Sequence, residues 1–179
     1  MDKTRIEIIL GCMFSGKSTE LLRRCNRYSA IGKKVLLINS QNDTRTGNSI
    51  KTHQNVKQEA IKVHNLLPDV IDSEKFKNSD VIGIDEAQFF EDLYEFVLTA
   101  EKYGKTIIIA GLDGDFNRKR FGQILDCIPL CDTVEKLSAM DMVSKDGTPA
   151  IFTKRLVNKD SQILVGSDDY YVAVSRKNY

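Results

Sequence analysis

The chain has 179 residues, 41% hydrophobic and 28% charged, which is the composition of an ordinary folded domain and excludes a disordered or fibrous chain. Its 26 basic and 25 acidic side chains leave a net charge of +1, so no global basic field recruits nucleic acid. Neither a membrane-spanning stretch of roughly 20 apolar residues nor an apolar signal-peptide core is evident. We therefore expect a cytoplasmic protein with no membrane and no nucleic-acid partner.

The first predicted elements are a strand, a phosphate-binding loop and a helix. The apolar run Ile6 to Leu10 predicts the strand, and apolar residues at helical spacing predict a helix over 18 to 28. Between them the chain reads GCMFSGKS, which matches the pattern G-x-x-x-x-G-K-[ST]. Its residues are Gly11, Cys12, Met13, Phe14, Ser15, Gly16, Lys17 and Ser18. Such a loop directs backbone N–H groups and the positive end of a helix at an anion, so the sequence predicts a polyphosphate site.

Within this loop, two side chains have predicted roles. Lys17 is expected to reach the terminal phosphates, and the hydroxyl of Ser18 is expected to bind Mg²⁺. Cys12 also lies in the loop, where a disulfide would obstruct a ligand. The four cysteines show no C-x-x-C spacing, so we expect reduced thiols and no metal site at Cys127 and Cys131.

The next part of the chain alternates strands with a helix. The predicted elements are a strand at 35–39, a long polar loop at 40–62 with a short strand near 60–63, a strand at 80–85, a helix at 93–103 and a strand at 106–110. This order implies an α/β fold, with a mostly parallel sheet flanked by helices. Ligands bind beyond the carboxyl ends of such strands, where Gly11, Asn39, Asp85 and Gly111 lie.

Beyond Asp132 the pattern changes to short β-like runs. They lie at 134–137, 150–153, 163–165 and 171–174. We therefore expect two units: an α/β nucleotide-binding core at 1–133 and a small β-rich subdomain at 134–179.

Two adjacent carboxylates follow the predicted strand at 80–85. Asp85 is placed to hold Mg²⁺ directly or through water. Glu86 points elsewhere, because side chains alternate on leaving a strand, and can face a second substrate. There it can accept a proton from an attacking hydroxyl or orient a hydrolytic water, and the pattern leaves both roles open.

Aromatic and basic side chains also gather near the predicted strand ends. Flat rings commonly hold a nucleobase, and we expect about half of Phe89, Phe90, Phe116 and Phe121 to belong to the core instead. One or two of the cations in predicted loops are expected to stabilise charge on a transferred phosphoryl group. These cations are Arg45, Arg118, Lys119, Arg120 and Arg155.

Four segments together resemble one enzyme family. GCMFSGKSTELLRR, VIGIDEAQFF, LDGDFNRKRFG and TKRL closely resemble the cytosolic type II thymidine kinases, and the resemblance runs from Ile6 to Tyr179. It implies a P-loop NTPase (RecA-like) core with a C-terminal lasso that closes over the nucleoside. It also implies Mg²⁺-dependent transfer of the γ-phosphoryl group of ATP to the 5′-hydroxyl of thymidine or deoxyuridine. A homotetramer and feedback inhibition by dTTP are further implications.

The resemblance assigns roles by motif. Glu86 matches the catalytic base, and Asp85 lies near the metal. Besides the phosphate loop, the ATP site is implied to include Asp43, Arg45, Asp85, Glu86, Ala87 and Gln88. The nucleoside site is implied to include Met13, Gln88, Phe89, Leu112, Phe116, Phe121, Gln162, Ile163, Leu164, Val165, Gly166 and Tyr171.

One departure from the family pattern concerns a metal. The resembling family ties its C-terminal appendage together with zinc held by two C-x-x-C pairs. Those positions carry Asp141, Ser144, Ser175 and Asn178 here. Structural zinc without thiolate or imidazole ligands would be exceptional, so we expect none and infer that β-pairing and a tetramer hold the appendage.

Two other classes of function fit parts of the sequence. The segment Asp85 to Gln88 also resembles the second motif of DEAD-box-like helicases, which favours a nucleic-acid-dependent ATPase; the short chain and balanced charge argue against it. The missing zinc cysteines favour a non-catalytic nucleotide-binding homologue. Because every residue assigned to chemistry is present, we rank the kinase first.

Overall fold

The computed structural model of the chain describes residues 4–44, 49–51, 57–158, 161–164 and 169–179. At its centre is a six-stranded sheet in the order β5-β2-β6-β7-β1-β8, in which every neighbouring pair runs parallel. Its strands are β1 (Arg5–Gly11), β2 (Val35–Ser40), β5 (Ile61–Val63), β6 (Val81–Ile84), β7 (Thr106–Gly111) and β8 (Thr133–Leu137). The predicted mostly parallel sheet is therefore confirmed.

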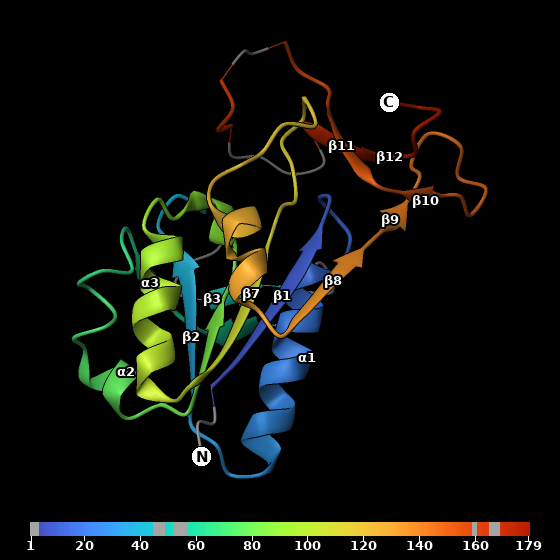
Figure 1. Ribbon diagram of the computed structural model, residues 1–179. Helices are drawn as coiled ribbons and strands as arrows, with labels where there is room; N and C mark the ends of the chain where they lie inside the picture. The colour runs from blue at the N-terminus through green and yellow to red at the C-terminus, as the bar shows by residue number, and fades with distance from the viewer. Residues whose placement is uncertain (1–3, 45–48, 52–56, 159–160, 165–168) are drawn as a thin grey trace.

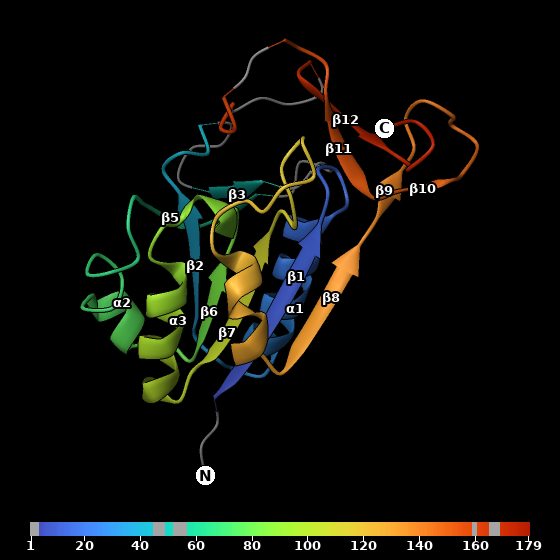
Figure 2. The ribbon, with the colours of Figure 1, turned by 45° about the horizontal axis from the view of Figure 1, so that its top comes forward.

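Helices cover both faces of this sheet. The helix α1 (Lys17–Ala30) lies on one face, and α3 (Leu93–Ala100) with the 3₁₀ helix η3 (Ile124–Leu130) lies on the other (Figures 1 and 2). Side chains of a strand alternate between the two faces, so β1 contributes to both cores. Ile9 packs with the α1 core, whereas Ile8 packs with the α3 core. The fold class is thus an α/β layered core.

The observed helices differ in part from the predicted ones. The predicted helix at 93–103 consists of α3 followed by the 3₁₀ turn η2 (Glu101–Tyr103), and it ends at Gly104, whose φ is 65°. The sequence did not predict η3 or the single-turn helix α2 (Glu74–Lys77). Another 3₁₀ turn, η1 (Ala87–Phe89), follows β6. Across the described residues, no helix has the length and apolar character that crossing a membrane requires.

Among the described residues, three small antiparallel sheets lie outside the central sheet. They pair β3 (Ser49–Lys51) with β4 (Lys57–Glu59), β9 (Ala139–Met140) with β10 (Pro149–Ala150), and β11 (Phe152–Arg155) with β12 (Tyr171–Val174). The pairs β9–β10 and β11–β12 lie beyond the carboxyl ends of the central strands (Figures 1 and 2). The two C-terminal pairs form the β-rich appendage that we expected.

Three expectations about strands need correction. We placed 134–137 in the appendage, but β8 is the sixth strand of the central sheet, with Val134 opposite Ile8 of β1. A boundary at 133/134 would cut this strand, so the appendage begins after Leu137, while the division into two units stays a prediction. The predicted loop at 40–62 contains the β3–β4 hairpin, and the described part of 163–165 is not a strand.

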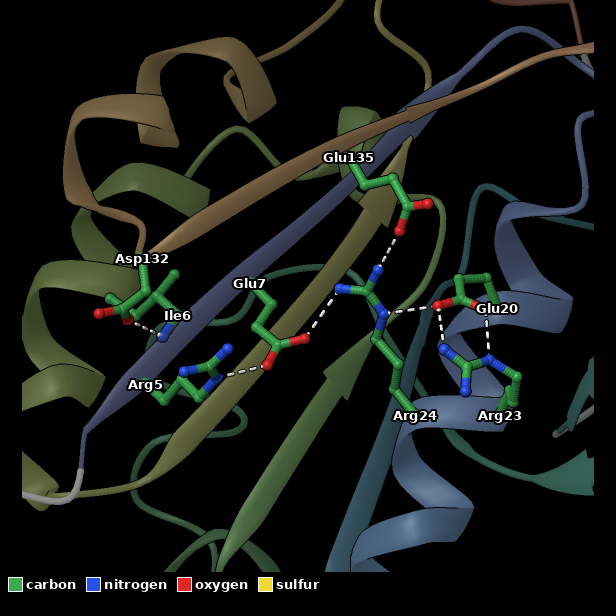
Figure 3. Close-up of polar contacts among 8 residues, drawn as sticks. All are labelled: Arg5, Ile6, Glu7, Glu20, Arg23, Arg24, Asp132 and Glu135. Atoms are coloured by element: carbon green, nitrogen blue, oxygen red, sulfur yellow. Dashed lines mark hydrogen bonds and ion pairs between the residues drawn. The ribbon is translucent and has the colours of Figure 1, made fainter.

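An ion-pair network joins β1, α1 and β8 (Figure 3). Glu7 of β1 points to the face that α1 covers, where its carboxylate bonds Arg24 at 2.8 Å and Arg5 at 2.6 Å. Arg24 also bonds Glu20 of its own helix at 2.7 Å and pairs with Glu135 of β8. Because Glu7 is nearly buried, removing Arg24 would leave its carboxylate paired with the half-exposed Arg5 alone, and its buried charge would be compensated less well. The network fixes the edge strand β8 against the helix that carries the phosphate loop.

Candidate active site

The phosphate loop has the backbone shape of an anion site. It leaves β1 at Gly11 and enters α1 at Lys17, and Phe14 (φ 66°) and Gly16 (φ 85°) adopt left-handed conformations. Within the described part of the chain no side chain caps the start of α1, so its first N–H groups are available to a ligand. The buried hydroxyl of Ser15 has no hydrogen-bond partner among the described residues. Phosphate oxygens would satisfy both kinds of donor, so the loop fits a polyphosphate.

The charged groups beside the loop fit a metal-bound phosphate. Lys17 Nζ donates to the Cys12 carbonyl at 2.7 Å, and burial lowers the pKa of Lys17 against the opposing effect of Glu86. Burial raises the pKa of Asp85, the charge of Glu86 raises it further, and contact with the Ser18 hydroxyl opposes both. Asp85 and Ser18 therefore adjoin, and such an oxygen pair suits Mg²⁺ completed by water and phosphate. Among the described residues, no group of three or more His, Cys, Asp and Glu side chains forms a separate metal cluster.

Glu86 is held in an uncommon conformation at the end of β6. Its φ of 49° is left-handed, which costs a non-glycine residue about 1–3 kcal/mol and occurs often at functional sites. Gln88 Nε2 donates to Glu86 Oε2 at 2.6 Å, and Gln88 Oε1 accepts from the Leu112 amide at 3.0 Å. Gln88 is only 3% exposed, so its amide links Glu86 to the exit of β7. Its predicted contact with base and sugar stays a prediction.

Aromatic residues line the neighbouring strand ends. Phe89 meets Phe121 edge to face, with ring centroids 5.6 Å apart, and Leu112 lies at the exit of β7. Phe116 is partly exposed and carries the Arg155 guanidinium over its ring, 3.6 Å from the centroid. Phe90, by contrast, is fully buried in the α3 core. The rings of Phe89, Phe116 and Phe121 are the candidates for a nucleobase wall.

Arg155 holds the described part of the predicted lasso. We expected it in a loop, but it lies on β11. Its Nη1 donates to the Ser161 carbonyl at 2.5 Å, and its Nη2 donates to the Gln162 carbonyl at 3.1 Å and to the Tyr171 hydroxyl at 2.7 Å. The Tyr171 hydroxyl in turn donates to the Leu164 carbonyl at 2.7 Å. Arg155 is therefore a positioning residue, because its donors are directed at residues 161–164 and Tyr171.

The same loop also contacts the segment after β7. Gln162 Nε2 donates to Asp115 Oδ2 at 2.8 Å, and Asp115 Oδ1 accepts from the amides of Asn117 and Lys119. Sequence reasoning missed Asp115, although the GLDGDF segment signalled a polar strand exit. Ile163 is exposed. The predicted site residues Arg45, Val165 and Gly166 lie outside the described residues.

The phosphate loop and the appendage are in direct contact. The Met13 amide donates to Thr153 Oγ1 at 3.0 Å, and the Cys12 thiol donates to the Ala150 carbonyl at 3.4 Å. Phe14 packs against the same small cluster. Sequence reasoning missed Thr153, whose only signal was its place in TKRL. These contacts bring the donor loop and the lasso-bearing hairpin together.

Two further predicted site residues, Asp43 and Ala87, follow the strands β2 and β6. Asp43 accepts a hydrogen bond from Asn39 at 3.1 Å near the carboxyl end of β2, and the Ala87 side chain is buried in the core. Asp113, which sequence reasoning missed, pairs with Lys136 at 2.6 Å, and its charge opposes in part the lowering of the Lys17 pKa by burial.

The other predicted cations lie mostly on the surface. The Arg118 guanidinium lies 4.2 Å from the ring centroid of Tyr179, and Arg120 pairs with Asp126. Lys119 is exposed as well. We therefore do not place Arg118 or Arg120 beside the phosphates.

Comparison with known proteins finds relatives that match along the whole chain. The thymidine kinase family model matches residues 4–179. The chain is 45% identical to the thymidine kinase of Sheeppox virus over all of its own length and 98% of the viral protein. It is 43% identical to thymidine kinase a of Arabidopsis thaliana and 42% identical to thymidine kinase 1 of Dictyostelium discoideum. These matches cover 97% and 98% of this chain, and 74% and 77% of the relatives.

The parts of the candidate site all lie within the segment that the family model matches. A phosphate loop, a paired carboxylate at the end of β6 and an aromatic wall after β7 lie along one edge of the sheet. The family match spans all of these parts. This chain belongs to the thymidine kinase family.

Proposed function

We propose that the chain transfers the γ-phosphoryl group of ATP to the 5′-hydroxyl of thymidine or deoxyuridine, for salvage of pyrimidine deoxynucleotides. The observation that carries this proposal is the placement of Glu86. It adjoins the phosphate loop on one side, and Gln88 ties it to the aromatic wall after β7 on the other. A base between a phosphate site and a ring-lined pocket suits phosphorylation of a nucleoside hydroxyl.

Each part of the site has a role in this proposal. Residues Gly11 to Ser18 hold the phosphates through the loop amides, the Ser15 hydroxyl and Lys17. Ser18 and Asp85 hold Mg²⁺, which supplies charge neutralisation on the phosphate oxygens when bound. Glu86 accepts the proton of the 5′-hydroxyl while the 5′-oxygen of the nucleoside bonds to the γ-phosphorus. The bond between the γ-phosphorus and the bridging oxygen breaks, and ADP leaves with that oxygen. The protein therefore contributes mainly positioning and electrostatic stabilisation.

The acceptor pocket is assigned to the opposite side of Glu86. Met13, Leu112, Phe116, Phe121 and Tyr171 are assigned to its walls, and the loop that contains Gln162, Ile163 and Leu164 is assigned to its cover. The hydrogen bonds of Arg155 and Gln162 support this assignment, because they hold the described part of that loop near Phe116 and Asp115.

Substitution of Glu86 tests the proposal. In Glu86→Gln we expect kcat to fall by at least about 10²-fold, the usual contribution of a general base, while ATP affinity stays nearly unchanged. Glu91→Gln is the matched control, because this exposed carboxylate follows the same segment. Turnover should be measured with labelled ATP and a panel of nucleosides, and ATP affinity by titration calorimetry. Unchanged turnover in Glu86→Gln would remove Glu86 from its role.

The same assay separates the competing functions. ATP hydrolysis that DNA stimulates and thymidine does not would favour a nucleic-acid-dependent ATPase. ATP binding without transfer to any nucleoside would favour a non-catalytic homologue. We rank phosphorylation of thymidine first because the residues assigned to metal, proton transfer and phosphate all meet at one edge of the sheet.

Three further properties are proposed from the family resemblance. We propose that the protein forms a homotetramer, that dTTP acts as a feedback inhibitor, and that the enzyme works in the cytoplasm without nucleic-acid or membrane partners. Light scattering after size-exclusion chromatography tests the tetramer. Inhibition of thymidine phosphorylation by added dTTP tests the second property, and fractionation of the source cells tests the third.

A further inference from the structure

Asp141 occupies the centre of a hydrogen-bonded cluster in the appendage. Its carboxylate is 1% exposed and accepts four hydrogen bonds from N–H donors. Oδ1 accepts from the amides of Val143 and Ser144 at 2.8 and 2.9 Å. Oδ2 accepts from the Ser175 amide at 2.7 Å and from Asn178 Nδ2 at 2.9 Å. Both carboxylate oxygens are therefore fully engaged by the protein.

The cluster joins two segments that are far apart in sequence. Asp141, Val143 and Ser144 lie in the turn between β9 and β10, whereas Ser175 and Asn178 follow β12. The Asn178 side chain also donates to Ser144 Oγ at 2.6 Å. Backbone bonds continue the junction, since the Met142 amide donates to the Ala173 carbonyl at 3.1 Å. The carboxylate thus clamps the end of the β11–β12 hairpin to a turn that the chain enters from the central sheet.

The four positions at this clamp do not fit a zinc ion. Asp141, Ser144, Ser175 and Asn178 stand where the resembling family carries two pairs of cysteines. They offer no thiolate and no imidazole, and Asn178 turns an N–H group, not a lone pair, toward the centre. A cation here would also have to displace donors that already bind both oxygens of Asp141.

We propose that the Asp141 carboxylate takes the structural place of the metal, as a metal-free clamp that holds the lasso-bearing hairpin. The charges are reversed relative to a zinc centre. Here a central anion accepts hydrogen bonds from the surrounding N–H donors, whereas a central zinc cation accepts lone pairs from surrounding anionic ligands. Charge-assisted hydrogen bonds from amides to a buried carboxylate are among the stronger ones in proteins, so four of them form a crosslink without metal. The clamp lies at one end of the hairpin, and Arg155, which holds the lasso, lies toward the other.

The clamp should make the stability of the protein independent of chelators and thiol oxidants. A zinc-thiolate crosslink is lost to chelators and to thiol oxidants, whereas a carboxylate clamp is lost to neither. The melting temperature of the full chain should be the same with and without a strong chelator, and metal analysis should find far less than one zinc per chain. One zinc per chain, or a chelator-induced fall in melting temperature, would overturn the proposal.

Hydrogen exchange tests the clamp directly and does not depend on catalytic activity. In Asp141→Asn, the amides of Val143, Ser144 and Ser175 should lose at least about tenfold of their protection, while the central sheet keeps its own. Asp146→Asn is the matched control, because this exposed residue of the same turn accepts from the Thr148 amide. Protection in Asp141→Asn equal to that of the unaltered chain would refute the clamp.

A second variant keeps the proposal testable if Asp141→Asn does not fold. The fourfold variant Asp141→Cys, Ser144→Cys, Ser175→Cys and Asn178→Cys would place four thiols where the clamp now lies. If these positions form one centre, it should bind one Co²⁺ per chain with the intense charge-transfer absorption of tetrahedral thiolate ligation, and its stability should become chelator-sensitive. Absence of tight Co²⁺ binding would show that the four positions do not converge, and would overturn the proposal.

Discussion

Replacing Gly122 with Ala should disturb catalysis through the backbone of Gln88. Gly122 has a φ of 64°, and a Cβ added to it would lie far inside contact distance of the Gln88 carbonyl oxygen and 2.9 Å from the carbonyl carbon. The Gln88 backbone, or the Gly122 loop, must therefore move. Because Gln88 Nε2 bonds Glu86 at 2.6 Å, the movement reaches the proposed base.

The magnitude follows from two separate costs. A left-handed conformation costs an alanine about 1 kcal/mol relative to glycine. The backbone collision adds about 1–3 kcal/mol, the usual cost of overpacking. Gly122→Ala should therefore lose about 2–4 kcal/mol of unfolding free energy. A misplacement of Glu86 by about 1 Å should lower kcat by about 10²-fold.

Gly104 supplies a matched control for this prediction. Its φ of 65° is nearly that of Gly122, but a Cβ at Gly104 would meet nothing within 4 Å. Gly104→Ala therefore carries the conformational cost alone, about 1 kcal/mol, and should leave kcat unchanged. The difference between the two variants isolates the collision with Gln88.

Urea denaturation and steady-state kinetics with thymidine and ATP measure the two effects. We expect the KM for ATP to change little in Gly122→Ala, because the three nearest atoms to the added Cβ all belong to the backbone of Gln88, which lies outside the phosphate loop. Equal destabilisation of the two alanine variants, or an unchanged kcat in Gly122→Ala, would refute the proposed link from Gly122 through Gln88 to Glu86.

Two further predictions concern Arg155 and Glu20. Arg155→Lys should raise the KM for thymidine by roughly tenfold with little change in the KM for ATP, because lysine cannot hold the carbonyls of residues 161 and 162 together with Tyr171. Arg118→Lys is the control. Equal KM values for thymidine in the two variants would contradict the role of Arg155. Hydrogen bonds from Arg23, then from Arg24, lower the pKa of Glu20 to about 2. The resulting stability, about 1 kcal/mol after solvent screening, should be present above about pH 4.5 and lost as the pH falls toward 2. Urea melts of Glu20→Gln should show a weaker acid dependence than those of Glu95→Gln, and identical pH profiles would exclude this contribution.

Local patterns predicted the donor half of the site because its parts are adjacent in the chain. The apolar run before Gly11, the glycine-rich loop and the helix that follows are one continuous segment, and the structure confirms all three. The strand that ends at the Asp85–Glu86 pair was also predicted, because the core on both faces of a parallel sheet requires a continuous apolar run.

The strand β8 was misassigned for a physical reason. It lies at the edge of the sheet, and Thr133 to Lys136 are exposed, so its sequence carries charges and lacks the apolar run of an interior strand. The β3–β4 hairpin was missed for a similar reason. Ile50 is its one fully buried hydrophobic residue among those described, which is too little to produce an alternating pattern.

By itself the sequence determined the phosphate loop, the buried strands of the central sheet with the helices α1 and α3, the carboxylate pair and the family, because these depend on neighbouring residues and on motifs. The tertiary structure alone decided how distant segments meet. Met13 bonds Thr153 across 140 positions, Gln162 bonds Asp115 across 47, and Asp141 bonds Asn178 across 37. Such bonds depend on how the central sheet and the appendage bring separate turns together in space. No local pattern encodes the partner of each donor and acceptor.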